Sequence, residues 1–428
     1  MIYLIENVSI LGGEPTSILI EDSSITQIGA GIEAKDAQRI DARNLIALPG
    51  LVDIHTHLRE PGREDAETVE SGTKAAARGG YTAVFAMANT NPVADTAGVV
   101  EQVWRLGNEA GYVDVSPVGA VTVGLAGKQL AELGAMADSA AKVRVFSDDG
   151  HCVSDAVLMR RALEYVKAFD GVVAQHPQEP RLTENAQMNE GELSGRLGLT
   201  GWPAVAEEAI IARDCLLAAH VGSRLHVCHV STKGSVELIR WAKSNGWNVT
   251  AEVTPHHLMF SDERVTTYDP VYKVNPPLRD QSDIAALRAG LADGTIDVVA
   301  TDHAPHPAEN KETEWAEAAF GMLGLEEALS VVQHTMVDTG LLNWEQVAER
   351  MSYQPARIGR LTEHGRPIAV GEPANICLYD PNATRVVDPT QSASKSRNNP
   401  YRELTLPGQV VATFLRGKPT VLESQVQF

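Results

Sequence analysis

The chain has 428 residues, of which 43% are hydrophobic and 21% are charged, and its formal net charge at pH 7 is -20. This length is enough for one large α/β barrel with a smaller attached domain, or for two to three ordinary domains. The negative charge argues against nonspecific binding to nucleic acid or to an anionic membrane, because both need a basic surface. An anionic substrate would therefore need a local positive centre.

Neither the N-terminus nor any apolar stretch has the pattern of a secreted or membrane protein. The first residues, MIYLIENVSILGG, lack the basic region and cleavage site of a signal peptide and are typical of a strand. No uninterrupted apolar stretch approaches the ~20 residues needed to span a bilayer. The cysteines Cys152, Cys215, Cys228 and Cys377 include no close pair, which argues against a disulfide framework or a structural zinc cluster. We expect a cytoplasmic protein with reduced cysteines.

Strand-like and helix-like segments alternate regularly from about residue 51 to about residue 337. Eight strands with intervening helices predict a (β/α)8 TIM barrel, although an open doubly wound sheet would begin in the same way. The predicted strands are Leu51–His57, Tyr81–Ala88, Val113–Gly119, Lys142–Ser147, Gly171–His176, Arg224–His229, Asn248–Val253 and Ile296–Thr301. The clearest helix-like stretches between them are Glu67–Arg78, Asp155–Ala168, Ala204–His220 and Lys233–Asn245.

The two ends of the chain have a different pattern, with short strands and turns in residues 1–50 and 366–428. Neither piece could bury a core alone. We therefore expect both ends to pair in one composite β-domain beside a catalytic barrel of residues 51–365. Short helices, including Trp344–Met351, would connect the last barrel strand to this domain.

A His-x-His pair lies at the end of the first predicted barrel strand, in Asp53-Ile54-His55-Thr56-His57. Side chains two residues apart on a strand point to the same face, so both histidines can face the barrel axis and bind one metal ion. Alone, such a pair can also occur on a strand by chance. The ends of the other strands therefore decide between these interpretations.

Four other predicted strands end in residues of the types that bind zinc. Imidazole nitrogens and carboxylate oxygens are accepted zinc ligands, and a catalytic zinc keeps positions open for water and substrate. Each residue alone has a structural alternative, since a histidine can be a hydrogen-bonded rim residue and Asp-Asp-Gly can be a turn. Together they predict a metal site at the C-terminal face of the barrel, where barrel enzymes have their active sites. These residues are Asp148-Asp149, His176, His229 and Asp302-His303.

Other histidines near these positions have weaker support as ligands. His256 and His257 follow the seventh predicted strand, but the ligands are already sufficient, so we expect a role beside the site. His226 lies three residues before His229, and this spacing puts the two side chains on opposite faces of a strand. We interpret His226 and Cys228 as packing residues or as supports for the ligands.

The segment Pro49–Gly62, PGLVDIHTHLREPG, strongly resembles the signature of dihydroorotases of the long bacterial type, within the amidohydrolase superfamily. The resemblance continues over nearly the whole chain. The other matching segments are Thr73–Gly80, Asn89–Pro92, Phe146–Gly150, His229–Thr232, Asn275–Arg279, Thr301–His306, Phe320-Gly321, Asn398–Tyr401 and Leu415–Lys418.

This resemblance implies reversible cyclisation of N-carbamoyl-L-aspartate to L-dihydroorotate in de novo pyrimidine biosynthesis. It also implies two zinc ions per subunit and a zinc-bridged hydroxide, with Asp302 as general acid and base. A mixed nitrogen and oxygen ligand set favours zinc over cobalt or manganese. We further expect a small-molecule substrate, a homo-oligomer that is a dimer, aspartate transcarbamoylase as a candidate partner, and neither a nucleic-acid nor a membrane partner.

The resemblance divides the metal ligands between two sites. Asp149 would bridge the sites and is preferred over Asp148 because its spacing to His176 is similar to that in the family. In this sequence Pro177 and Gln178 follow His176, whereas many relatives have a cysteine and an acid there, so the local loop geometry can differ. The implied ligands are His55, His57 and Asp302 for one zinc, His176 and His229 for the other, and Asp149 for both.

The resemblance also implies a set of substrate-binding residues. Arg59 would bind the free carboxylate of the substrate with its planar guanidinium, although it could instead be a solvated loop cation. Asn89 and Asn275 lie beside prolines and could equally form turns. The substrate-binding residues would be Arg59, Asn89, Asn275 and His306, with backbone atoms near Phe320 and Gly321 contacting the ring amide.

Two other functions compete with this interpretation. A hydantoinase-like or allantoinase-like cyclic amidohydrolase would generally bridge its metals with a carboxylated lysine at the end of strand four, but that end is Val145–Asp149 and Lys142 precedes the strand. A catalytically inactive scaffold for aspartate transcarbamoylase would typically have lost metal ligands, and this chain retains the full set. Both alternatives therefore fit the residues less well than a dihydroorotase.

Overall fold

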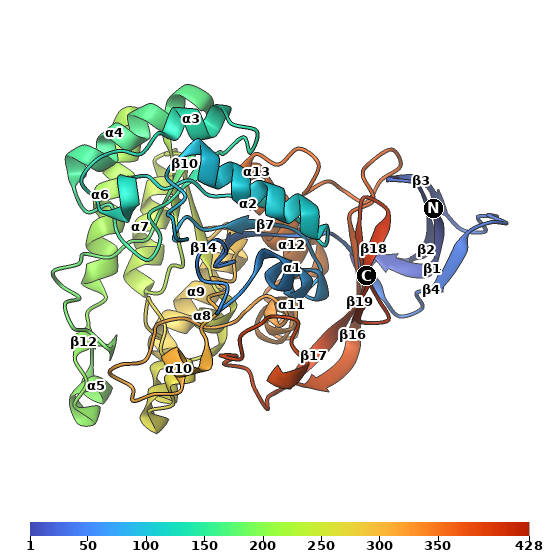
Figure 1. Ribbon diagram of the computed structural model, residues 1–428. Helices are drawn as coiled ribbons and strands as arrows, with labels where there is room; N and C mark the ends of the chain where they lie inside the picture. The colour runs from blue at the N-terminus through green and yellow to red at the C-terminus, as the bar shows by residue number, and fades with distance from the viewer. Residues whose placement is uncertain (428) are drawn as a thin grey trace.

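The computed structural model describes residues 1–427, and Figure 1 shows a barrel of strands surrounded by helices. Eight parallel strands of the described chain form the barrel wall in two hydrogen-bonded runs. Bridges between Gly119 and Phe146 and between Thr56 and His303 join the two runs into a closed ring. The strands are β6 (Leu51–Thr56), β7 (Tyr81–Ala86), β8 (Asp114–Pro117), β9 (Val145–Phe146), β10 (Val172–Gln175), β13 (Arg224–Val227), β14 (Val249–Val253) and β15 (Val298–Val299).

The closed ring confirms the TIM barrel and rules out the open doubly wound sheet. All eight predicted strands are present, and each is shorter than predicted. β14, for example, begins one residue later than predicted but ends at Val253, as predicted. The barrel interior is filled by small and branched residues such as Val52, Ile54 and Ala174. Ala356 and Ile358 belong to the same interior cluster, so the segment after the barrel closes one end of it.

Helices cover the outside of the barrel (Figure 1). The four helices predicted most clearly correspond to α1, α4, α6 and α7, within three residues at each end. Local sequence sets their starts, since the side chain of Thr68 accepts a hydrogen bond from the amide of Ser71 and that of Thr232 accepts one from Ser235. The helices are α1 (Val69–Arg78), α2 (Ala97–Ala110), α3 (Leu133–Asp138), α4 (Ala156–Val166), α5 (Glu192–Leu197), α6 (Val205–Val221), α7 (Lys233–Ser244), α8 (Pro255–Met259), α9 (Gln281–Asp293), α10 (Ala308–Lys311), α11 (Ala328–Val332), α12 (Trp344–Ala348) and α13 (Gln354–Gly359).

Strands from both ends of the chain pair in one nine-stranded sheet, which lies beside the barrel with both termini (Figure 1). The two ends meet where β16 runs antiparallel to β5, which itself runs parallel to β1. A separate apolar cluster that includes Ile5, Ile18 and Phe414 packs inside this sheet. The strands are β1 (Ile2–Ile10), β2 (Pro15–Glu21), β3 (Ser24–Gly29), β4 (Gln38–Asp41), β5 (Ile46–Pro49), β16 (Ile376–Val386), β17 (Thr405–Leu415), β18 (Lys418–Leu422) and β19 (Gln425–Val426).

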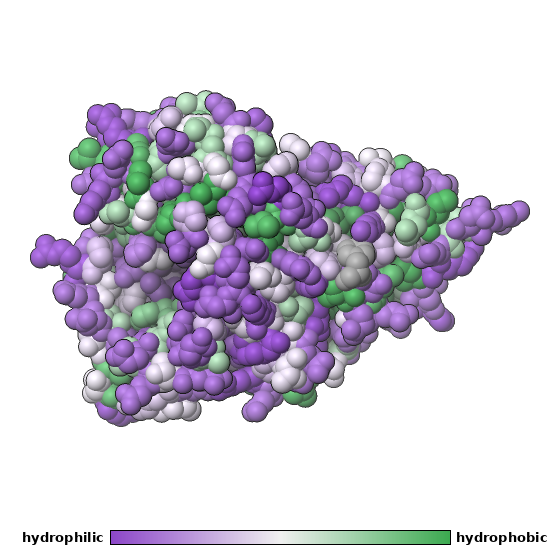
Figure 2. Space-filling view, in the orientation of Figure 1, coloured by the Kyte–Doolittle hydropathy of each residue, from purple (hydrophilic) through white to green (hydrophobic). Residues whose placement is uncertain are grey.

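The sheet agrees with the predicted pairing of the termini, whereas the domain limits at residues 50 and 366 stay a prediction. The predicted helix Trp344–Met351 is α12 followed by a π-helical turn over Glu349–Tyr353. A further two-stranded element, β11 (Met188–Asn189) with β12 (Gly201–Trp202), lies outside the barrel wall. No helix within residues 1–427 is long and apolar enough to cross a membrane. Figure 2 shows a mostly hydrophilic face on which hydrophobic side chains form small separate groups.

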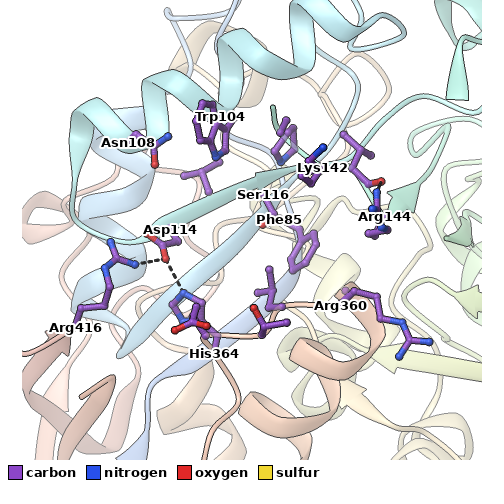
Figure 3. Close-up of a pocket in the computed structure, with 18 residues that line it drawn as sticks. Phe85, Trp104, Asn108, Asp114, Ser116, Lys142, Arg144, Arg360, His364 and Arg416 are labelled. Atoms are coloured by element: carbon purple, nitrogen blue, oxygen red, sulfur yellow. Dashed lines mark hydrogen bonds and ion pairs between the residues drawn. The ribbon is translucent and has the colours of Figure 1, made fainter. Parts of the chain in front are cut away.

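A cavity of about 420 Å³ lies at the N-terminal end of β8, where the barrel meets the sheet of the termini (Figure 3). Asp114 begins β8 and accepts hydrogen bonds from two lining residues (Figure 3). His364 Nε2 lies 2.7 Å from its Oδ2, and Arg416, in the turn between β17 and β18, contacts the same oxygen. Burial alone would raise the pKa of Asp114, but the hydrogen bonds from His364 and Arg416 outweigh it and hold that pKa at about 2.

The Asp114 cluster should make stability depend on pH in the acid range. Because the folded-state pKa of Asp114 lies below its ordinary value of 3.8, its contribution is fully present above about pH 4 and is lost as the pH falls towards 2. We expect wild type to unfold at higher urea concentration than Asp114→Asn at pH 5, and this difference to shrink at pH 3. A difference that stays constant, or widens at pH 3, would show that the cluster does not hold a charged Asp114.

Candidate active site

Six residues that the sequence predicts as metal ligands meet at the C-terminal ends of the barrel strands. All six are buried, with exposed fractions between 0% and 6%. Strand alternation brings the two histidines of the His-x-His pair to the same side, as expected. The six residues are His55 and His57 from the end of β6, Asp149 after β9, His176 after β10, His229 after β13 and Asp302 after β15.

The first group of ligands consists of His55, His57, Asp149 and Asp302. His57 Nε2 lies 3.0 Å from Asp302 Oδ1 and 3.2 Å from Asp149 Oδ2. His55 Nε2 lies 3.4 Å from Oδ1 of each of the same two carboxylates. Two imidazoles and two carboxylates therefore surround one point at the end of the barrel.

The second group consists of Asp149, His176 and His229. Asp149 Oδ1 lies 3.1 Å from His176 Nδ1 and 3.2 Å from His229 Nε2, and these two ring nitrogens lie 2.9 Å apart. Asp149 therefore belongs to both groups. This arrangement is what a two-metal centre with one shared carboxylate requires.

Asp148 points away from both groups. Its Oδ1 accepts hydrogen bonds from the backbone amides of Val121, at 2.8 Å, and Thr122, at 2.9 Å. Asp148 thus fixes the loop after β8, and its neighbour Asp149 is the residue that lies among the histidines. The role of Asp149 as the shared metal ligand stays a prediction.

The donor atoms of the first group fit a metal ion. His55 Nε2 is buried and has no hydrogen-bond partner in the described structure, although it faces two carboxylates. A buried nitrogen without a partner is costly unless something else satisfies it, and imidazole and carboxylate donors are those that zinc accepts. Cys228 also lies near His55, in a third group with Glu252, but burial raises the pKa of its thiol, which disfavours the thiolate needed for metal binding.

Two of these ligands have an unfavourable backbone conformation, and one buried carboxylate, Asp53, links two of the strands that carry ligands. His229, with φ of 30°, and Asp302, with φ of 48°, adopt the left-handed conformation, which is unfavourable for residues other than glycine. Asp53 Oδ1 accepts hydrogen bonds from the amides of His55, at 3.0 Å, and Thr301, at 3.2 Å. Asp53 therefore ties the first and last barrel strands together immediately below the ligands.

At neutral pH the Arg59 side chain is charged, whereas the neighbouring His306 side chain is neutral. Burial lowers the pKa of Arg59 to about 10, so its guanidinium stays charged at neutral pH. Burial and the charge of Arg59 lower the pKa of His306 to about 2, so its imidazole stays neutral. Burial opposes the charged form of Asp149, but His55 and the hydrogen-bonded histidines outweigh it and hold its pKa well below the ordinary range.

Four of the predicted substrate-binding residues lie together. Arg59 Nε donates to the carbonyl of Pro305 at 3.1 Å, and its Nη2 lies 3.5 Å from His306 Nε2. His306 Nε2 donates to the carbonyl of Phe320 at 2.8 Å. Gly321 has φ of 139°, and a Cβ there would lie 2.8 Å from His306 Nε2, so only glycine fits beside this imidazole.

Of the two predicted asparagines, Asn89 contacts a predicted metal ligand and Asn275 contacts a neighbour of one. Asn89 Oδ1 lies 2.8 Å from His57 Nδ1, on the side of the ring away from the carboxylates. Asn275 Nδ2 donates to Gln178 Oε1 at 3.1 Å, and its Oδ1 is buried without a partner in the described structure. Their role in substrate binding stays a prediction, because each also supports the centre or a neighbour of it.

Sequence reasoning missed several residues that hold the site together. Glu252 in β14 contacts both His55 and His226, and Gln178 Oε1 lies 2.8 Å from His176 Nε2. A charged residue inside a mostly apolar strand was the available signal for Glu252. His226 contacts Glu252, which agrees with its interpretation as a support for the ligands.

Two buried lysines anchor the segment that carries Phe320 and Gly321. Lys273 Nζ donates to the carbonyls of Trp315 and Ala316, and Lys311 Nζ donates to those of Lys273 and Ala319. The two ammonium groups therefore satisfy backbone carbonyls that a sheet or helix would otherwise satisfy in this irregular segment.

Comparisons with known proteins match the chain over nearly its whole length. The family model described as dihydro-orotase-like matches residues 44–235. The dihydroorotase of Streptomyces coelicolor is 67% identical over 99% of both chains, and that of Mycobacterium tuberculosis is 56% identical over 97% of both chains. Among solved structures, the L-hydantoinase (dihydropyrimidinase) from Arthrobacter aurescens is 26% identical with a TM-score of 0.88, covering 100% of this chain and 98% of that one. The dihydropyrimidinase of Brevibacillus agri, 24% identical with a TM-score of 0.85 over 100% of this chain and 96% of that one, shares the fold.

High identity to dihydroorotases over the whole chain, together with the paired groups of histidines and aspartates, shows that the chain belongs to the dihydroorotase family.

Proposed function

We propose that the chain catalyses the reversible cyclisation of N-carbamoyl-L-aspartate to L-dihydroorotate. The observation that carries this proposal is the pair of ligand groups sharing Asp149, with the charged Arg59 beside them. A cyclic amide hydrolase needs a centre that activates water, and an acidic substrate needs a fixed cation. This chain offers both at one end of its barrel.

We propose two zinc ions per subunit as the metal. His55, His57 and Asp302 would hold one ion, His176 and His229 the other, and Asp149 would contact both. Bound zinc supplies Lewis acidity, which lowers the pKa of water towards ~7 and polarises a carbonyl group. The orphaned Nε2 of His55 and the shared carboxylate support this assignment.

Asp302 would move the proton of the reaction. In ring opening its carboxylate takes a proton from the attacking water and gives it to the amide nitrogen that leaves the carbonyl carbon. In ring closure it takes a proton from the carbamoyl nitrogen, which attacks the carbon of the side-chain carboxylate, and gives that proton to the carboxylate oxygen that leaves. This oxygen takes a second proton from solvent and departs as water. Such transfer typically contributes ~10²–10⁴-fold to the rate, and Asp302 Oδ1 lies 3.0 Å from His57 Nε2, within the proposed centre.

Arg59 would bind the carboxylate that does not react. Its guanidinium contacts a backbone carbonyl and a neutral imidazole, so within the described residues its charge has no carboxylate in hydrogen-bond contact. A planar guanidinium can bind a carboxylate with two parallel hydrogen bonds. The Phe320-Gly321 backbone and the side chains of Asn275 and Asn89 would contact the rest of the ring.

No observation favours a hydantoinase-like activity over this proposal. Lys142, the lysine that precedes β9, donates to the carbonyl of Asp138 and lines the cavity at the opposite end of the strand (Figure 3). Lys142 is therefore in the wrong place to bridge metals beside Asp149. The full set of proposed ligands also argues against an inactive scaffold.

We also propose a cytoplasmic homodimer, with residues 1–50 and 366–428 as its composite β-domain and residues 51–365 as its catalytic barrel. The sheet that both chain ends share supports this division. Aspartate transcarbamoylase is the candidate partner. Light scattering of the purified chain, alone and mixed with that enzyme, tests the dimer and the partner.

Replacing Asp302 should remove the proton carrier and leave the fold. We expect Asp302→Asn to reduce ring opening of L-dihydroorotate and closure of N-carbamoyl-L-aspartate by about 10²-fold or more, with an unchanged circular dichroism spectrum. Asp170→Asn is the matched control, because Asp170 also has a positive φ but is exposed and remote. Near-normal turnover in Asp302→Asn would sink the proposed mechanism.

Replacing Arg59 should mainly weaken substrate binding. A hydrogen-bonded charge pair contributes ~1.5–3 kcal/mol, so Arg59→Ala should raise KM by about 10-fold to 100-fold, with a smaller change in kcat. Arg63→Ala, in the same loop and paired with the exposed Asp65, should leave both constants unchanged. Equal KM values for wild type and Arg59→Ala would show that Arg59 does not bind the substrate.

Removing metal should abolish activity reversibly. We expect about two zinc ions per chain by elemental analysis of carefully purified protein, loss of ring opening after chelation, and recovery on adding zinc. Fewer than about one zinc per chain in fully active protein would contradict the two-zinc centre.

A further inference from the structure

We propose that Glu252 is a positioning residue that holds ligands of both metal groups, so that its charge strengthens metal binding at both. This inference rests on the proposed ligands but assigns a role to a residue outside them. Glu252 lies in β14 and is 1% exposed. A carboxylate this deeply buried needs partners for both oxygens, and its partners show what it does.

Glu252 contacts three histidines at the ligand end of the barrel. Its Oε1 lies 2.5 Å from His55 Nδ1 and accepts a hydrogen bond from the backbone amide of His229 at 3.1 Å. Its Oε2 lies 2.9 Å from His226 Nε2. One carboxylate thus joins the ends of β6, β13 and β14.

The contact with His55 decides which ring nitrogen is free for metal. An ionised carboxylate only accepts hydrogen bonds, so His55 Nδ1 must carry the proton that it donates to Glu252. His55 Nε2 is then the nitrogen with a lone pair, and it is the buried atom without a partner that faces Asp149 and Asp302. A carboxylate behind a ligand histidine also makes that histidine a stronger ligand.

The contact with His229 fixes a ligand of the other group. The backbone of His229 has φ of 30°, which is unfavourable and needs support from its surroundings. The hydrogen bond from its amide to Glu252 supplies this support, while its Nε2 lies 3.2 Å from Asp149. Asp149 thus lies at the Nε2 atoms of His55 and His229, while Glu252 contacts Nδ1 of His55 and the backbone amide of His229.

The surroundings of Glu252 allow its charge to be removed with little change in shape. In Glu252→Gln the amide oxygen would still accept from His55 and from the amide of His229. The new amide nitrogen would donate a hydrogen bond to His226 Nε2. The ring proton of His226 would then lie on Nδ1, which is 2.8 Å from Thr250 Oγ1. That hydroxyl can accept it, because it donates to the carbonyl of Leu225. The variant thus tests charge rather than packing.

The experiment measures zinc binding by the metal-free full chain, in competition with a chromophoric chelator and without substrate. We expect Glu252→Gln to bind zinc about 10-fold to 100-fold more weakly than wild type at both sites, with a thermal midpoint of the metal-free protein close to that of wild type. Glu207→Gln is the control, since Glu207 is equally buried but accepts from the amide of Ser231 and the hydroxyl of Ser235. It should bind zinc as wild type does.

Three results would overturn the inference. Wild-type zinc affinity in Glu252→Gln would show that the charge is not needed, and an equal loss in Glu207→Gln would show that any buried carboxylate has the same effect. If Glu252→Gln does not fold without metal, Glu252→Asp is measured instead, because its shorter side chain cannot reach His55 and His229 together. Wild-type zinc affinity in Glu252→Asp would then overturn the proposal. Weak zinc binding by wild type itself would instead contradict the proposed metal centre.

Discussion

The site depends on one buried carboxylate, Asp149, which lies within 3.4 Å of a ring nitrogen of each of four histidines. These histidines follow three different strands, so they meet only if the ring is closed in a single register. The bridge between Thr56 and His303 and the hydrogen bonds from Thr301 and His55 to Asp53 fix that register beside the ligands. The contacts that close the barrel therefore also position the ligands.

Much of this construction could be predicted from local sequence, because each ligand directly follows an apolar run. Strand alternation located His55 and His57, and the fixed rim of a parallel barrel brought the other ends to them. Alternation was a poor guide after β13, since the strand ends at Val227 and the positive φ of His229 changes the direction of the chain. His226 contacts Glu252 through its ring, and His229 contacts the same carboxylate through its backbone amide.

Sequence reasoning interpreted His226 as a possible support for the ligands, but it could not identify the contacts that hold them in place. Glu252 and His55 are 197 residues apart, and nothing in either segment indicates that they touch. The orientation of Gln178 towards His176 and Asn275 likewise depends on how two loops meet. Local patterns identify side chains with reactive groups, whereas the contacts that orient those groups depend on packing between distant segments. Arg59 stays charged at neutral pH although the same packing lowers its pKa to about 10, in a chain whose overall charge is negative.

The sheet shared by both termini has a consequence for how the protein is made. Synthesis proceeds from the N-terminus, so β1 to β5 leave the ribosome long before β16, the neighbour of β5 in the finished sheet. The edge of β5 must stay unpaired while more than three hundred residues of barrel and connecting helices are made. Unpaired strand edges invite aggregation during folding. The first strands to emerge thus belong to the last part of the fold to be completed, and barrel formation must proceed beside a half-built sheet.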